Sequence, residues 1–273
     1  RHGDAAPICM AVAQDAHGLG FEKFKGNPVI AEPPRGISPL RWRDPMIWRE
    51  ADAWSMVVGA GTEGGRGAVL LYRSPDLLNW EYVGPMLEGD ATQGTMWECP
   101  AFFPLGDRHI LLVSLMPQDC VITFIGSYAN GRFTPERSGT LDAGRHFYAP
   151  QVFLAPDGRQ LMIGWVWEGR TDERQQAAGW AGVMSTPQEL FLTGQRRIGR
   201  RFVPELAALR HRGQVIGAAD LHADTSLPIE GVSGDALEIS AVFDLNDAGA
   251  GAVGVAVRCS PAAPGRGRNA SRA

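Results

Sequence analysis

The sequence predicts an all-β fold, and three observations support this prediction. Short runs rich in β-branched, aromatic and other apolar residues recur along the 273 residues. Glycine, proline, asparagine and aspartate separate these runs, as strands joined by turns require. A segment of the form x-Pro-x-apolar-apolar occurs three times, with its prolines about 50 to 55 residues apart, which is the spacing of four-stranded propeller blades. The predicted architecture is therefore a β-propeller with a further β domain behind it.

The strands are predicted from five apolar runs bounded by turn residues, which cover residues 54–59, 68–72, 109–113, 121–125 and 161–165. Sustained helical periodicity is nearly absent from the chain. The exception is the segment 204–210, where a proline stands near the first turn of an expected short helix.

The repeat consists of DPMIW at 44–48, CPAFF at 99–103 and APQVF at 149–153. Each copy is followed by two or more strand-like runs, so each is expected to begin a blade. Residues 10–21 fit the last part of the same template, which places residue 1 inside a blade. We therefore expect the sequence to be a fragment, in which residues 1–197 form a propeller that lacks its N-terminal portion.

The C-terminal residues are predicted to form a second domain. A linker at 198–212 contains the short helix, and beyond it the runs 237–243 and 252–257 alternate as sandwich strands do. Residues 213–273 are therefore expected to form a partial β-sandwich that is too short to be whole. Its last residues, rich in proline, glycine, alanine, arginine and serine, are expected to be a disordered tail.

Composition limits the expected partners. The formal net charge is −4 and acidic and basic residues are interleaved, so neither nucleic acid nor an anionic membrane surface is expected. No apolar run approaches the roughly 18 residues of a membrane helix, and the basic cluster at 195–201 is expected to be a solvated connector. Nothing implies a metal or organic cofactor, because neither metal-ligand spacing nor the density of a disulfide scaffold is found among Cys9, Cys99, Cys120 and Cys259.

Two carboxylates stand at the repeat. Asp44 and Glu98 lie where two predicted blades begin, and residues at the starts of inner blade strands surround a common funnel. Two carboxyl groups that converge on one cavity meet the requirement of glycoside hydrolysis, in which one protonates the leaving oxygen and the other stabilises or attacks the sugar cation. The alternative is that both side chains cap strand ends or pair with arginines.

Several motifs follow one another in a distinctive order. WRDP at 42–45 and WECP at 97–100 are accompanied, also in order, by FKGNPVI at 24–30, LYRSPDL at 71–77, FYAPQ at 147–151, GW at 164–165 and VPEL at 203–206. The set spans most of residues 11–210, which makes it far more specific than any one motif. It resembles glycoside hydrolase family 32, the invertase, levanase and inulinase family, with its RDP and EC motifs.

The resemblance implies a five-bladed propeller followed by a β-sandwich, and hydrolysis of the β-fructofuranosyl bonds of sucrose or fructans with retention. Glu98 would be the general acid/base, and Cys99 beside it would tune its proton affinity. Asp44 would hold fructose hydroxyls and stabilise the oxocarbenium-like transition state, with Arg43 as a neighbouring donor. The expected partner is a small or polymeric fructoside, and sucrose, sucrose 6-phosphate, levan and inulin all stay open, as do oligomeric state and compartment.

Aromatic residues complete the expected site. Tyr148 and Trp165 would form part of the wall of the sugar pocket, with core packing as an equal alternative for Trp165. The other tryptophans considered are expected to be core residues, namely Trp48, Trp54, Trp80 and Trp167.

The sequence also departs from the family pattern. The family's nucleophile is an aspartate in an Asn-Asp-Pro-Asn type motif, which this sequence lacks, since its sole Asp-Pro is Asp44-Pro45. His146 stands where the family commonly has an acid. Without a nucleophile the double displacement cannot form its covalent intermediate, so we expect the chain as written to be inactive or severely impaired. The alternatives are a non-catalytic fructan-binding propeller and a decayed gene product.

Overall fold

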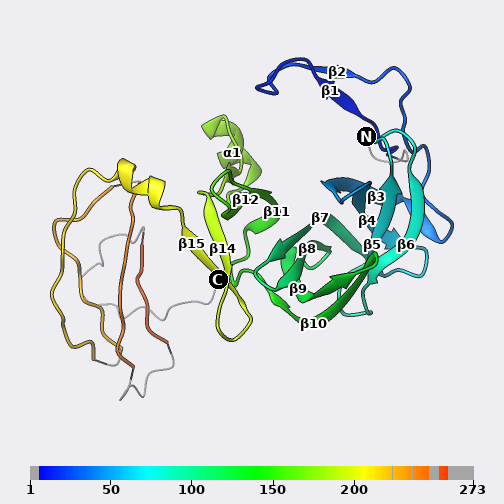
Figure 1. Ribbon diagram of the computed structural model, residues 1–273. Coiled ribbons are helices and arrows are strands. Elements are labelled where there is room, and N and C mark those ends of the chain that lie inside the picture. The colour runs from blue at the N-terminus through cyan, green and yellow to red at the C-terminus, as the bar shows by residue number, and fades with distance from the viewer. Residues whose placement is uncertain (1–5, 223, 235, 246–251, 258–273) are drawn as a thin grey trace. The chain divides into compact units, whose positions relative to one another are not determined.

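The computed structural model describes residues 6–222, 224–234, 236–245 and 252–257. Strands dominate its secondary structure (Figure 1), which confirms the all-β prediction. The chain divides into two compact units, Arg1–Ala207 and Ala208–Ala273.

The first unit contains three successive antiparallel sheets and a hairpin in its described residues. The first sheet has the order β3-β4-β5-β6, with β3 (Ile37–Arg49), β4 (Trp54–Thr62), β5 (Gly67–Ser74) and β6 (Glu81–Glu88). The second has the order β7-β8-β9-β10, with β7 (Met96–Leu105), β8 (Arg108–Met116), β9 (Cys120–Ala129) and β10 (Arg132–Thr140). Each is a simple up-and-down sheet, the form of a propeller blade.

The third sheet runs β11-β12-β14-β15, and β13 also pairs with β12. Its strands are β11 (Phe147–Leu154), β12 (Gln160–Val166), β13 (Val183–Met184), β14 (Gln188–Leu192) and β15 (Ile198–Phe202). The hairpin joins β1 (Ala11–Ala13) to β2 (Phe21–Lys23). All five predicted apolar runs lie in strands, and the three copies of the repeat lie in the first strand of each sheet, β3, β7 and β11. The total of five blades stays a prediction.

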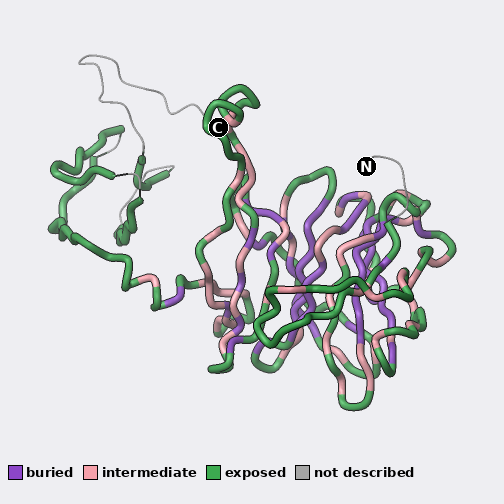
Figure 2. Tube along the Cα trace, turned by 90° about the horizontal axis from the view of Figure 1, so that it is seen from above, coloured by how far each residue is buried: buried purple, intermediate pink, exposed green. Residues whose placement is uncertain are grey.

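The middle strands of the first two sheets are buried because apolar cores cover both of their faces. One core joins Val57 and Leu71 of the first sheet to Phe102 and Leu111 of the second. Another cluster combines residues of the second and third sheets, including Leu112 and Met162, and a third covers the other side of the first sheet. Figure 2 shows buried residues concentrated along these strands. A strand buried on both faces is apolar throughout, which is why these strands appear as continuous apolar runs.

Two helical segments interrupt the strands. The helix η1 (Pro204–Leu209) is a short 3-10 helix and confirms the predicted connector helix. The helix α1 (Asp172–Ala178) was not predicted, because it has no buried residue and hence no apolar face. Its terminal residues did carry a signal: Asp172 and Glu173 occupy the first turn, and Gly179 ends the helix in the left-handed conformation.

The predicted linker and second domain are described only in part. The strand β15 lies within the segment predicted to be a linker, and the basic cluster forms the turn before it and the strand itself. No strand occurs among the described residues after Phe202. The sandwich and the domain bounds therefore stay predictions, and the proposed disordered tail lies outside the described residues. Among the described residues, no helix is both long and apolar enough to cross a membrane.

Candidate active site

The same irregularity occurs in the first strand of each sheet. The strand pairing shifts by one residue between Arg43 and Met46 in β3, between Glu98 and Ala101 in β7, and between Tyr148 and Gln151 in β11. The extra residue before each proline has a positive φ, at Asp44 (φ 61), Cys99 (φ 46) and Ala149 (φ 49). Such a β-bulge re-aims the side chains on either side of it.

The bulges correct one detail of the sequence interpretation. Asp44 and Glu98 were both expected at the start of a blade and thus in equivalent places. The pairing instead makes Asp44 equivalent to Cys99, and Glu98 equivalent to Arg43 and Tyr148. Each bulge turns two successive side chains toward the same site. The side chains of Arg43, Asp44, Glu98, Cys99 and Tyr148 therefore still lie together.

Buried aromatic residues anchor the bulges. Each bulge is preceded by a buried aromatic residue that stands three residues before the proline. These residues are Trp42, Trp97 and Phe147, which are 0%, 0% and 8% exposed. Their burial in the cores fixes the backbone from which the polar groups of the next positions project. The tryptophan of each WRDP and WECP motif is therefore a packing residue.

Glu98 is held at both of its carboxyl oxygens. Its Oε1 accepts hydrogen bonds from Nε and Nη2 of Arg43, at 2.9 and 2.7 Å. Its Oε2 accepts one from the Tyr148 hydroxyl, at 2.7 Å. The Glu98 side chain is 17% exposed and that of Arg43 33%. Glu98 thus pairs with an arginine, as the alternative interpretation of the two carboxylates expected. This ion pair fixes the orientation of its carboxyl group.

Asp44 contacts the next residue of the second sheet. Its Oδ2 accepts the backbone N–H of Cys99 at 3.1 Å and lies 3.5 Å from the Cys99 Sγ. The bulge frees this N–H from the strand ladder, and a buried N–H needs a partner. In the same way, the Ala149 N–H donates to Ser114 Oγ at 3.0 Å. Side chains of one sheet thus satisfy the bulge of the following sheet.

Burial and neighbouring charge set the protonation of two site residues. Burial, followed by the charge of Asp44, raises the pKa of Cys99 to about 12. Burial and then the hydrogen bond to Glu98 raise the pKa of Tyr148 far above its ordinary value. Both groups are therefore neutral near pH 7, so Tyr148 is a hydrogen-bond donor and Cys99 is a thiol.

The aromatic wall differs from the prediction. Trp165 is 43% exposed and pairs with Tyr148 across β11 and β12, so the alternative of core packing is wrong for it. Trp167 was predicted to be a core residue but stacks on Tyr148, with ring centroids 5.2 Å apart. It also contacts Trp165 edge to face at 5.7 Å. The signal in the sequence was the spacing, because residues two apart on a strand share a face.

Trp48 and Trp80 pack against two of the cores, as predicted. Trp54 is partly buried beneath Arg49. The backbone of His146 lies beside the site, since its carbonyl oxygen accepts a hydrogen bond from the backbone N–H of Trp167 at 2.8 Å.

Close backbone approach brings the first two sheets together. A Cβ added to Gly59 of β4 would lie 2.3 Å from the carbonyl oxygen of Trp97 and 3.3 Å from that of Arg43. Only glycine fits between these carbonyls without a shift. The approach places Arg43 and Glu98, which lie 55 residues apart in the sequence, within hydrogen-bond distance.

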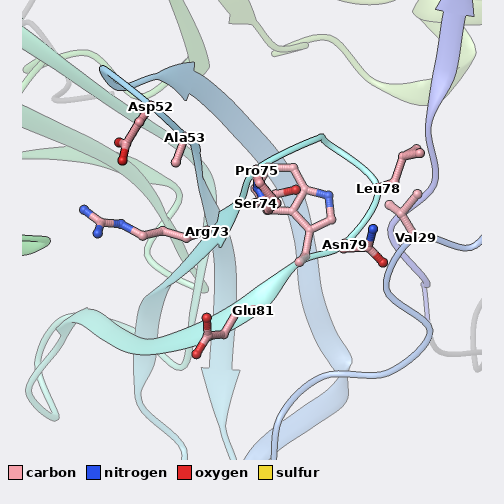
Figure 3. A pocket seen from close by; sticks show the side chains of 10 residues that line it. Val29, Asp52, Ala53, Arg73, Ser74, Pro75, Leu78, Asn79 and Glu81 are labelled. Atoms are coloured by element: carbon pink, nitrogen blue, oxygen red, sulfur yellow. The ribbon is translucent and has the colours of Figure 1, made fainter.

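A separate hollow lies on the first sheet (Figure 3). Its volume is about 660 Å³, and its lining includes Asp52, Arg73, Asn79 and Glu81. It contains none of the predicted site residues. Among the described residues, no group of three or more histidine, cysteine, aspartate or glutamate side chains is placed to hold a metal ion.

Comparison with known proteins agrees with these features. The Glycosyl hydrolases family 32 N-terminal domain matches residues 4–200. A sucrose-6-phosphate hydrolase of Escherichia coli is 41% identical over 76% of this chain and 44% of its own length. A raffinose invertase of Escherichia coli is 34% identical over 78% of this chain and 46% of its own length. The chain thus spans about half the length of these relatives.

Solved structures give the same result. A β-fructofuranosidase of Bombyx mori has a TM-score of 0.66 and 35% identity, over 75% of this chain and 45% of its own. Fructan 1-exohydrolase IIa of Cichorium intybus, in complex with 1-kestose, has a TM-score of 0.68 and 26% identity, over 75% of this chain and 43% of its own. These relatives are β-propellers, in agreement with the successive antiparallel sheets. The chain belongs to glycoside hydrolase family 32.

Proposed function

We propose that the cluster around Glu98 is the general-acid side of a β-fructofuranosidase site that acts with retention. The observation that carries the proposal is the fixing of both Glu98 oxygens, by Arg43 and by Tyr148. An acid that is already held in place loses less conformational entropy on reaching the transition state than one that must first be ordered. The names of the sucrose-6-phosphate hydrolase and raffinose invertase relatives support a sucrose-type fructoside as the substrate, and a sucrose complex of the Bombyx mori relative supports a small one.

The proposed roles follow from the position of each group. Glu98 donates its proton to the glycosidic oxygen and later receives one from water. Arg43 and Tyr148 orient its carboxyl group. Asp44 accepts hydrogen bonds from fructose hydroxyls and stabilises the positive charge that develops on the sugar. Cys99 stays a neutral thiol beside both carboxyl groups, and its backbone N–H donates a hydrogen bond to Asp44.

The first step of a retaining reaction also needs a nucleophile, which attacks the sugar while the acid protonates the leaving oxygen. The 273 residues contain no Asn-Asp-Pro-Asn type motif, and retention requires a carboxylate that attacks the sugar. We therefore propose that these residues alone do not complete the double displacement, and that the three sheets belong to a five-bladed propeller. The same absence favours, as the second candidate function, a propeller that binds fructosides without cleaving them.

The test is fructose release from sucrose by the purified chain, with Glu98→Gln as its matched variant. We expect no release from either protein, together with sucrose binding to the unaltered chain. Release that disappears in Glu98→Gln would confirm the acid and overturn the proposal that the nucleophile is missing. Release that persists in Glu98→Gln, or a failure of sucrose to bind, would contradict the role of Glu98 or of the site itself.

A further inference from the structure

A single polar side chain interrupts the buried part of β8. Residues 110–115 of this strand are buried and apolar except for Ser114, which is 0% exposed. A buried hydroxyl group costs free energy unless it makes a hydrogen bond. The partner of Ser114 lies in the next sheet, where the backbone N–H of Ala149 donates to its Oγ at 3.0 Å. Ser114 therefore joins the second sheet to the third at a point shielded from solvent.

This hydrogen bond is made at the bulge that presents Tyr148 to the candidate active site. Ala149 has a φ of 49 and is left without a partner where the pairing of β11 with β12 shifts between Tyr148 and Gln151. Because the bulge takes the Ala149 N–H out of the strand ladder, this group needs another acceptor, and Ser114 supplies it. The position of the bulge, and of the Tyr148 side chain next to it, thus depends on the Ser114 hydroxyl.

Two acceptors lie near the Tyr148 hydroxyl. Its oxygen is 2.7 Å from Glu98 Oε2 and 3.4 Å from the carbonyl oxygen of Leu115, the residue after Ser114. A phenol has one proton to donate, and the shorter distance gives this proton to Glu98. A displacement of the bulge changes both distances. The backbone at Ala149 therefore decides whether Glu98 receives the hydrogen bond.

We propose that Ser114 is a positioning residue for Glu98, which it holds through the bulge at Ala149 and the Tyr148 hydroxyl. This inference rests on the proposed function, in which Glu98 is the acid. Ser114 is also the partner of Glu98 in the pairing of β7 with β8, and opposite residues of an antiparallel pair share one face of the sheet. The serine thus lies between the acid and the residue that orients it.

Calorimetric titration of sucrose into the purified chain tests this inference. We expect Ser114→Ala to raise the dissociation constant of sucrose about fivefold, the effect of losing one neutral hydrogen bond. The reason is that Glu98 is then no longer held in place for the glycosidic oxygen. Ser114→Thr keeps a hydroxyl group at this position and should restore the affinity. Hydrogen exchange of the Ala149 amide, followed by NMR, should be faster in Ser114→Ala than in Ser114→Thr.

A double-mutant cycle separates positioning from a general loss of stability. Tyr148→Phe removes the hydroxyl group that connects Ser114 to Glu98. In the Tyr148→Phe background, Ser114→Ala should therefore weaken sucrose binding no further. A serine that only stabilises the fold would lower the affinity by the same factor in both backgrounds, and that result would overturn the inference.

The matched control is Ser55→Ala in β4. Ser55 is also 0% exposed, but its hydroxyl group has no hydrogen-bond partner among the described residues, so its loss should leave the dissociation constant unchanged. Thermal unfolding checks that each variant is folded. If Ser114→Ala does not fold, Ser114→Cys takes its place, because a thiol packs similarly and is a weaker acceptor.

The two possible failures can be told apart. An unchanged dissociation constant in the folded Ser114 variant would overturn this inference while the proposed function stands. If the unaltered chain does not bind sucrose, the proposed function fails and this inference fails with it.

Discussion

At the scale of single residues, the candidate site is set by backbone geometry as much as by side-chain chemistry. Asp44 and Cys99 both adopt positive φ values before a proline, a conformation that costs of the order of 1 to 3 kcal/mol and persists only where the surroundings enforce it. The hydrogen bond from the Cys99 N–H to Asp44 is one such constraint. The strain lets two successive residues face one site, which a regular strand cannot do.

Cys99 should be an unreactive thiol in the folded chain. Because burial and then Asp44 raise its pKa to about 12, only about one molecule in ten thousand carries the thiolate near pH 8. Iodoacetamide should therefore label exposed Cys9 far faster than Cys99, and the labelling of Cys99 should increase with rising pH. Asp44→Asn removes one cause of the raised pKa, so it should accelerate labelling of Cys99 alone.

Peptide mapping by mass spectrometry measures each cysteine separately in the same sample, so Cys9 serves as the internal control. Labelling of Cys99 as fast as Cys9 would contradict the buried, acid-paired thiol.

The proximity of the candidate site residues could be predicted from the sequence, but their backbone geometry could not. The repeat placed Arg43, Asp44, Glu98 and Cys99 together, since equivalent places of a repeat meet in space. The copies of the repeat already align Asp44 with Cys99, but the bulge that turns two successive side chains toward one site is a property of the backbone. Trp167 was missed because its neighbours are apolar enough to suggest a core strand.

At the scale of elements, close packing of the first two sheets positions Arg43 against Glu98. The strands themselves were predictable because burial on both faces leaves continuous apolar runs. The helix α1 was not, because its side chains contribute nothing to a core and helical periodicity needs an apolar face.

Gly59→Ala should destabilise the chain, because its Cβ would meet the Trp97 carbonyl at 2.3 Å. Backbone atoms cannot yield as the end of a flexible side chain can, so we expect a loss of about 2 kcal/mol in unfolding free energy and a Tm lower by about 5 °C. Gly139→Ala in β10 is the matched control, since nothing lies within 4 Å of its Cβ position. Equal Tm values for the two variants would argue against the close approach.

At the scale of the whole molecule, the described sheets are successive units of one repeating design. Each is antiparallel, each begins with a bulge at an x-Pro dipeptide, and apolar cores separate them. The sequence could predict this design because the prolines mark its period. The second unit was harder, because alternating apolar residues at 237–243 suggested a strand that its described residues do not form.

The central claim is that Asp44 and Glu98 belong to a fructoside site, and calorimetric titration of sucrose tests it most directly. Asp44→Asn should raise the dissociation constant of sucrose about tenfold, which corresponds to the loss of one hydrogen bond to a charged group. Asp52→Asn, which changes an aspartate of the separate hollow shown in Figure 3, should leave binding unchanged. The reverse result, with sucrose affinity lost in Asp52→Asn and kept in Asp44→Asn, would contradict the account.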